Sequence, residues 1–375
     1  MWNIHDKTDP PKELYYSAKQ WVHSCFEDQE ELQRFYKECI SENVPCKPIS
    51  PKQKMGWPQL VKPRPHYIVA MPMGRVWGKN GAVISPDNRL IWDASHEIMK
   101  EPHEHSLFSH KELPPVHFIP ENLAVLTHME GFSYYFWMFD VLARIGLLQR
   151  NGMQIDKYVL TPMNRSFQEE TLTELGVSPE KRMICDNHTH IQALELIVTP
   201  LVADTGMTPK WVCDYLRAEF LQKREVKPSR DFKRVYISRA DAKRRQVTNE
   251  LEVMDYLKSR GFACLLLDGL TVAQQAQVFS SADIIVAPHG AGLTNLIFSK
   301  PRTKVIELFS PLWVRHTYWW ISQHGDLDYD RLVCDRPMLP ITPSASLTEF
   351  LRALEADITV DLKKFKKKLR RVGIT

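Results

Sequence analysis

The sequence predicts an α/β protein made of two Rossmann-like halves with a cleft between them. Its 375 residues are too many for one ordinary core, because domains average roughly 150 residues. Between residues 234 and 309, short apolar runs alternate with helical stretches. This rhythm is typical of a parallel sheet covered by helices on both faces. The composition, 43% hydrophobic and 25% charged, is that of an ordinary globular protein, so we expect little disorder.

The first half offers a less regular pattern. Apolar residues at near-helical spacing predict a helix within residues 9–40, and the prolines of residues 45–65 indicate an irregular connector. Short apolar runs separated by turn residues predict an antiparallel meander over residues 66–92. An aromatic-rich helix is expected at Ser133–Leu148. The expected domain boundary is the segment of residues 203–233, whose end is basic and contains proline.

The second half alternates regularly. We expect strands at residues 234–239, 262–268, 283–287 and 304–309, and helices at residues 249–260, from Thr271, and at 293–298. Thr271 and Gln274 have the spacing of a capping box. Ligands of such sheets bind at the carboxyl ends of the strands, so candidate site residues are sought there. The expected domains are residues 1–205 and 206–345, followed by a C-terminal helix and basic tail at 346–375.

Charge and cysteine usage exclude several classes of protein. The net charge of +4 depends on residues 363–371, which hold seven of the 49 basic residues; the other 42 are fewer than the 45 acidic ones. A nucleic-acid partner is therefore not expected. Seven scattered cysteines without CxxC spacing indicate free thiols and no zinc site. Without a membrane-spanning run or a secretory signal, a cytoplasmic location is the default expectation.

The loop from Pro288 to Gly292 is the first candidate site. It leaves a buried strand and opens a helix, and glycines allow a ligand to approach the backbone closely. Helix N-termini favour anions such as a diphosphate, although a plain tight turn is an equal alternative. Arg239, at the end of its own strand, adds a guanidinium suited to phosphate oxygens. Arg244 and Arg245 follow it, either as further anion ligands or as solvated surface residues.

Glu307 is a carboxylate within the apolar strand VIELF and needs a partner there. A ribose diol is the favoured partner, and a structural salt bridge is the alternative.

The stretches ISRADAKRRQVTNE, DGLTVAQQAQVFSSADIIVAPHGAGLTNLIF, VIELFSP and TYWW resemble glycosyltransferase family 61 over roughly residues 234–334. The stretch SYYFWMFDVLARI is similar to an upstream motif of that family. The family includes plant xylan-decorating enzymes, O-linked N-acetylglucosamine transferases and bacterial glycan enzymes, and we expect a soluble member of the bacterial kind. The resemblance implies a GT-B architecture, a UDP-linked sugar donor, inversion at the sugar carbon and no bound metal.

The resemblance also implies roles for parts of the chain. Residues 1–205 would form the acceptor side and residues 206–345 the nucleotide-sugar-binding domain, with a glycan or protein as acceptor. The residues that fall on the donor motif or on the helix start after it are Arg239, Asn249, Glu250, His289, Gly290, Ala291, Gly292, Leu293, Thr294 and Asn295. With Arg244 and Glu307 they form the expected donor site. No cofactor is expected beyond the UDP-sugar co-substrate.

Asp140 is the first candidate for the base that accepts the acceptor's proton. Pairing with Arg144, one helical turn away, is the structural alternative, and His128, Glu130 and Asp93 are substitutes. His289 is expected to donate to the donor's phosphate or sugar, with packing beside a glycine turn as its alternative role.

Two residues of the upstream motif depart from the family pattern. Ser133 replaces the usual Asn and Phe136 a common His, so a nucleotide-sugar binder without catalysis is the alternative function. An esterase is less favoured, because the chain contains no Gly-x-Ser-x-Gly.

Two further segments carry weaker hypotheses. Asp326, Asp328 and Asp330 have the DxD spacing of metal-dependent glycosyltransferases, but such acidic triplets are frequent by chance. The basic tail Lys363–Arg371 could attach the protein to an anionic membrane, with a solvated terminal helix as the favoured alternative.

Overall fold

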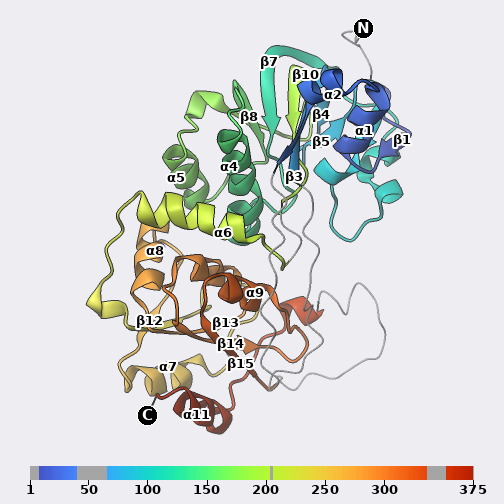
Figure 1. Ribbon diagram of the computed structural model, residues 1–375. Coiled ribbons are helices and arrows are strands. Elements are labelled where there is room, and N and C mark those ends of the chain that lie inside the picture. Colours follow the sequence, from blue (N-terminus) through green and yellow to red (C-terminus); the bar gives the residue numbers. More distant parts are fainter. Residues whose placement is uncertain (1–7, 40–65, 203–205, 336–351, 375) are drawn as a thin grey trace. The chain divides into compact units, whose positions relative to one another are not determined.

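The computed structural model describes residues 8–39, 66–202, 206–335 and 352–374. These residues form two compact units, one ending at Val202 and the other beginning at Gly206 (Figure 1). The expected connector at residues 45–65 lies outside the described residues. Helices and strands mix in both units, so the α/β prediction is confirmed.

The first unit contains a mixed sheet of ten strands in its described residues. Its central path runs β1-β6-β5-β4-β10-β7-β8-β9, with β3 beside β10 and β2 beside β3. The strands are β1 Glu13–Tyr15, β2 Tyr36–Cys39, β3 His66–Pro72, β4 Arg75–Trp77, β5 Ala82–Ile84, β6 Arg89–Ile91, β7 His117–Val125, β8 Lys157–Leu160, β9 Arg182–Ile184 and β10 His190–Val198.

Only part of this sheet is Rossmann-like. The neighbours β10, β7, β8 and β9 run parallel, whereas β4, β5 and β6 form the predicted antiparallel meander. The expectation of a Rossmann-like first half therefore holds for four strands and is wrong for the rest. The reason is in the connections, because short turns between β4, β5 and β6 permit only antiparallel pairing.

The helices of the first unit are α1 Ala18–Cys25, α2 Gln29–Phe35, α3 Tyr134–Phe136, α4 Leu142–Arg150 and α5 Ser166–Glu174. The helix expected within residues 9–40 is two short helices, and strands β1 and β2 flank them. Pairing of β1 with β6 and of β2 with β3 overrides the local helical spacing. The aromatic helix after Ser133 is present as α3 and α4, joined by a π-helical turn, η5, at Trp137–Val141.

The second unit has the regular parallel sheet that the sequence predicts. Its order is β12-β11-β13-β14-β15, and all four pairings are parallel. The strands are β11 Arg234–Ile237, β12 Ala263–Leu265, β13 Ile284–Pro288, β14 Lys304–Phe309 and β15 Asp328–Val333. The first four match the predicted strands, and β15 was not predicted, because its polar sequence DYDRLV lacks an apolar run.

Helices cover both faces of this sheet (Figure 1). They are α6 Lys210–Arg217, α7 Glu250–Lys258, α8 Val272–Ser281, the 3₁₀ helix η9 Ala291–Phe298, α9 Thr317–His324 and α11 Leu362–Arg371. Thr271 and Gln274 form the predicted capping box at the start of α8. On one face, α7 and α11 share a buried cluster with the side chains of Tyr236, Val286 and Ile306. The shorter helical turns of the second unit are η7 Ala218–Gln222 and η8 Arg230–Phe232. Those of the first unit are η2 Trp92–Ala94, η3 Pro102–Glu104, η4 Ser106–Ser109 and η6 Pro179–Lys181.

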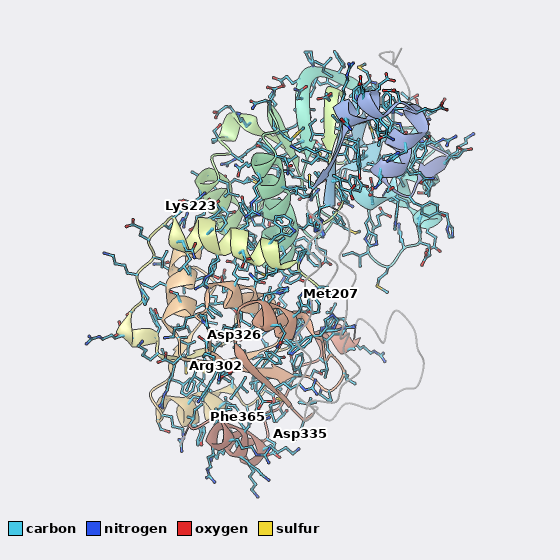
Figure 2. All side chains as sticks on the ribbon, viewed as in Figure 1. Met207, Lys223, Arg302, Asp326, Asp335 and Phe365 are labelled. Atoms are coloured by element: carbon cyan, nitrogen blue, oxygen red, sulfur yellow. The ribbon has the colours of Figure 1, made fainter. Side chains whose placement is uncertain are left out.

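The basic tail is part of the second unit's core. Helix α11 carries Phe365, labelled in Figure 2, and Leu369, and both side chains are fully buried. The apolar face that could have entered a membrane is therefore occupied within the protein. None of the helices in the described ranges combines the length and the apolar character needed to cross a bilayer.

Candidate active site

The glycine loop lies where the sheet of the second unit places it, at the carboxyl end of the fully buried strand β13. His289 continues the pairing by donating its backbone N–H to the carbonyl of Leu308, 2.9 Å away. Gly290 then caps η9, which begins at Ala291. The loop thus turns from a strand directly into a helix N-terminus, the arrangement that favours an anion.

Arg239 explains why residue 290 is glycine. A Cβ atom built on Gly290 would lie 1.7 Å from Nη1 of Arg239, far inside any allowed contact. The guanidinium therefore lies directly on the glycine backbone. Arg239 also donates from Nη2 to the carbonyl of Arg244 at 3.0 Å, which holds it over the loop.

A second guanidinium, that of Arg245, joins this site. Its Nε donates to the carbonyl of His289 at 3.1 Å and its Nη1 to the carbonyl of Leu354 at 2.9 Å. Burial, together with the neighbouring charge of Arg239, lowers the pKa of Arg245 to about 10. Both arginines remain cationic at neutral pH, and neither pairs with a carboxylate in the described parts of the chain. Two partly desolvated cations that form no ion pair among the described residues can attract an anion.

The prediction named Arg244 beside Arg239 as a donor-site arginine, and the structure favours Arg245 in place of Arg244. The Arg244 side chain is half exposed, and its Nε lies 4.0 Å from a carboxylate oxygen of Glu355. Arg245 adopts a positive φ of 54°, and its side chain packs inward beside His289. The sequence offered both arginines equally, because only the backbone conformation decides which one faces the loop.

Glu307 holds His289 and does not face an open site. Its Oε1 accepts a hydrogen bond from Nδ1 of His289 at 2.5 Å, and its Oε2 accepts one from the hydroxyl of Tyr329 at 2.5 Å. Glu307 is fully buried, so both oxygens are used by protein groups. The prediction of a ribose contact is therefore corrected: Glu307 is a positioning residue. Tyr329 was missed because it lies on the unpredicted strand β15.

The imidazole of His289 is fixed on both faces as well. It stacks on Phe309 with centroids 5.2 Å apart and lies 5.1 Å from the ring of Tyr318. Burial lowers the pKa of His289, and the nearby Glu307 carboxylate offsets only part of that effect. The neutral ring donates its Nδ1 proton to Glu307, which leaves the lone pair on Nε2 available. Its side chain keeps 10% of its surface exposed.

Several predicted donor-site residues serve the fold through their side chains. Asn249 exchanges two hydrogen bonds, of 3.0 and 2.9 Å, with the backbone of Val360 and so attaches the C-terminal segment. Asn295 donates to Gln275 at 2.7 Å and to the carbonyl of Gly292 at 3.1 Å. The buried residues are Leu293, Thr294 and Asn295, whereas Ala291 and Gly292 are partly exposed. A donor contact from the Asn249 or Asn295 side chain is therefore corrected to a structural role.

Asp140, the predicted base, forms a buried ion pair. Its Oδ1 lies 2.7 Å from Nη2 of Arg144, and its Oδ2 accepts the backbone N–H of Val202 at 2.8 Å. The two side chains are 1% and 0% exposed, and Arg144 also donates to three backbone carbonyls. The structural alternative therefore holds, and the base assignment to Asp140 is corrected.

Two of the substitute bases in the first unit, Asp93 and His128, are also engaged. Asp93 accepts hydrogen bonds from the backbone N–H of Ala18 and the hydroxyl of Tyr67. His128 stacks on Phe136, with ring centroids 4.7 Å apart, and its Nδ1 accepts the N–H of Glu130. Burial lowers the pKa of His128 to about 4. Its neutral ring thus carries the proton on Nε2, which makes it a donor and not a base.

Two of the three aspartates of the DxD hypothesis form ion pairs. Asp328 lies 3.2 Å from Arg302, and Asp330 lies 2.8 Å from Lys368 of α11. The carbonyl of Asp326 accepts the N–H of Arg302; both residues are labelled in Figure 2. These contacts explain the triplet as structural.

Comparison with known proteins finds similarity in the part of the chain that holds this loop. The family model Glycosyltransferase 61 matches residues 134–306, which include Arg239 and the glycine loop. A beta-1,2-xylosyltransferase of Oryza sativa subsp. japonica is 32% identical over 92 residues, or 22% of this chain and 17% of that protein. A beta-1,2-xylosyltransferase of Arabidopsis thaliana is 27% identical over 90 residues, covering 24% and 17%. Residues 134–306 of this chain are therefore similar to glycosyltransferase family 61.

Proposed function

We propose that this protein transfers a sugar from a UDP-linked donor to a hydroxyl group of a glycan acceptor, with inversion at the sugar carbon. The observation that carries the proposal is the pair of unneutralised guanidinium groups, Arg239 and Arg245, beside the turn at His289 and Gly290. A GT-B arrangement of the two units, with the acceptor on the first, is part of the proposal.

The donor diphosphate would lie against the two arginines and the N-terminus of η9. As the bond to the sugar breaks, negative charge develops on the departing diphosphate, and fixed cations stabilise it. Two guanidinium groups supply the positive charge for which other glycosyltransferases use a metal ion. We therefore propose that transfer proceeds without a metal cofactor.

His289 is the proposed base. Its Nε2 would accept the proton of the acceptor hydroxyl while that oxygen bonds to the sugar carbon and UDP leaves with the electron pair of the broken bond. The Glu307 carboxylate, 2.5 Å from Nδ1, would stabilise the resulting imidazolium. Because burial lowers the pKa of His289, the ring stays neutral and able to accept a proton below its usual pKa of 6.5.

The relatives guide the choice of donor. Both are named beta-1,2-xylosyltransferases, and each alignment covers 17% of the relative, so their activity suggests candidates. UDP-xylose is the first donor to test, followed by UDP-glucose and UDP-N-acetylglucosamine.

The test is release of UDP from these donors in the presence of a panel of neutral oligosaccharides, with and without EDTA. We expect EDTA-insensitive release with at least one donor. His289→Asn and Glu307→Gln should slow turnover by roughly 10²-fold or more while UDP affinity changes less than about threefold. Arg244→Ala is the matched control and should retain activity. Loss of UDP affinity in His289→Asn would assign the ring to the phosphate and contradict the base role.

A nucleotide-sugar binder without catalysis remains the alternative because Phe136 replaces the family's common histidine. Such a protein would bind UDP, yet it would release none from any donor in this assay.

A further inference from the structure

The first unit contains a cavity of about 250 Å³ that the donor site does not use. It is lined by Trp77, Gly78, Lys79, Asn80, Ala82, Glu97, His105, Ser106, His110 and Asn187. All of these residues belong to the first unit, and none falls within the family match at residues 134–306 except Asn187. A smaller cavity that extends to His128 shares Asn80, Ala82, Glu97 and His105 with it, so the two adjoin.

Trp77, the last residue of β4, provides an aromatic wall. Its indole meets the ring of His110 edge to face, with centroids 4.6 Å apart and planes at 70°. Behind it, Trp77 packs on a buried cluster that includes Ile84 and Leu107, which fixes the ring in place. The Nε1–H of Trp77 is buried and has no hydrogen-bond partner in the described structure. Because this N–H is shielded from solvent, the indole offers the cavity its apolar ring surface.

Two amide side chains add donors and acceptors to this wall. Asn80 lies in the tight turn between β4 and β5, where Gly78 and Gly81 adopt φ values of 71° and 65°. That turn is held by its own backbone and by the bond from the N–H of Gly78 to the carbonyl of Thr189. The side chains of Asn80 and Asn187 both line the cavity. No hydrogen bond of either side chain is found among the described residues, so neither is needed to keep the turn in place.

The charged group in the floor of the cavity is neutralised by the protein. Glu97 is 4% exposed, pairs with Lys100 at 2.8 Å and accepts hydrogen bonds from the N–H and hydroxyl of Ser106. Burial raises the pKa of Glu97, but these hydrogen-bond partners together lower it by more. The pKa of Glu97 therefore lies below its usual value. Lys79 is exposed at the rim. The cavity therefore offers no uncompensated charge at its base, unlike the site at Arg239 and Arg245.

These features select the chemical class of the ligand. Binding pockets combine aromatic surface with a few placed polar groups, and those for drug-sized molecules measure about 300–1,000 Å³. A smaller cavity with an indole wall, two free amides and a neutralised floor suits one neutral ring that carries hydroxyl groups. Among the residues that line it, Lys79 at the exposed rim is the one lysine or arginine that could pair with an anionic nucleotide.

We propose that this cavity, the Trp77 pocket, binds one neutral sugar unit of the acceptor glycan. The assignment of the ligand to the acceptor rests on the proposed function. The indole face would cover the apolar C–H face of the ring, and the amides of Asn80 and Asn187 would bind hydroxyl groups.

The test follows the indole N–H signals of the full chain in ¹H–¹⁵N NMR spectra. The Trp77 signal is assigned by its disappearance in Trp77→Phe, and the other indoles serve as internal controls. The probes are the methyl glycosides of xylose, glucose, galactose, mannose and N-acetylglucosamine, each titrated to tens of millimolar, with UDP as the comparison ligand.

We expect at least one glycoside to shift the Trp77 signal saturably, and UDP to leave it unchanged. Asn80→Ala should weaken that glycoside at least fivefold with an unchanged spectrum otherwise, since its side chain holds no part of the fold. Absence of any saturable shift, or equal affinity in Asn80→Ala and wild type, would overturn the pocket. Saccharide binding without UDP-sugar turnover would retain the pocket and refute the transferase, and turnover with an unaffected Trp77 would do the reverse.

Discussion

Arg239 lies against Gly290 so closely that its Nη1 occupies the place where a side chain at residue 290 would begin, 1.7 Å from the position of a Cβ atom. This contact joins the ends of β11 and β13 and places a guanidinium at the opening of η9. A side chain at residue 290 would therefore have to displace the guanidinium of Arg239.

Gly290→Ala should displace the Arg239 guanidinium and weaken UDP binding at least tenfold, while the unit still folds. Isothermal titration with UDP measures the effect. Gly325→Ala is the matched control, because a Cβ there would meet its neighbours at ordinary contact distances of 3.4 Å or more. Equal UDP affinity in Gly290→Ala and wild type would show that the position of Arg239 does not matter for the donor.

Asp140→Asn tests whether the buried pair with Arg144 is structural. Removing one partner of a buried ion pair typically costs about 3–5 kcal/mol, because the other charge stays buried and unpaired. We expect a loss of this size in denaturant unfolding, with turnover within about tenfold of wild type where the protein is folded. Turnover that is roughly a thousandfold slower at unchanged stability would instead restore Asp140 as the base.

Stability should fall in mild acid. Burial lowers the pKa of both His66 and His128 to about 4, from an ordinary value of 6.5. Above pH 6.5 both rings are neutral in the folded and unfolded states. As the pH falls from about 6.5 to 4, the unfolded chain binds protons first, so each ring costs up to about 3 kcal/mol of stability.

Unfolding in urea at pH 7 and pH 5 measures this loss. The variant His128→Gln should show a smaller difference between the two pH values than wild type. The same difference in both proteins would mean that His128 is not held neutral by the fold.

Phe365→Ala should destabilise the second unit by about 3–5 kcal/mol, because the side chain is fully buried in the cluster beneath α11. Lys367→Ala, at an exposed position of the same helix, should change stability by less than about 0.5 kcal/mol. Thermal unfolding compares the two. If Phe365→Ala is no more harmful than Lys367→Ala, α11 is not part of the core.

The burial of α11 also decides how membrane attachment should be tested. Deleting residues 363–375 would remove buried side chains, so charge-reversal variants at exposed lysines are the suitable probes for anionic vesicles.

The second unit was predictable because its signals are local. The strands ending near Arg239 and Pro288 are short apolar runs, and the capping box at Thr271 needs only two residues at a fixed spacing. Strand β15 was not predictable from its polar sequence, since its place is fixed by pairing with β14 over residues far apart in the chain.

The side-chain roles were harder to predict because they also depend on contacts between residues far apart in the chain. Motif position placed Asn249, His289 and Glu307 in one site, but only the fold shows that Glu307 faces His289 and that Asn249 faces the backbone of Val360. Likewise, Arg244 and Arg245 are chemically equivalent in sequence, and a positive φ at Arg245 separates them.

The central claim is that Arg239 and Arg245 bind a donor diphosphate, and titration calorimetry of UDP with wild type, Arg245→Ala and Arg244→Ala tests it most directly. Hydrogen bonds to charged groups contribute about 1.5–3 kcal/mol, so we predict roughly 10-fold or greater weakening in Arg245→Ala. Arg244→Ala should stay within about threefold of wild type, and EDTA should change none of these affinities. Failure of wild type to bind UDP at millimolar concentration, or equal losses in the two variants, would contradict the account.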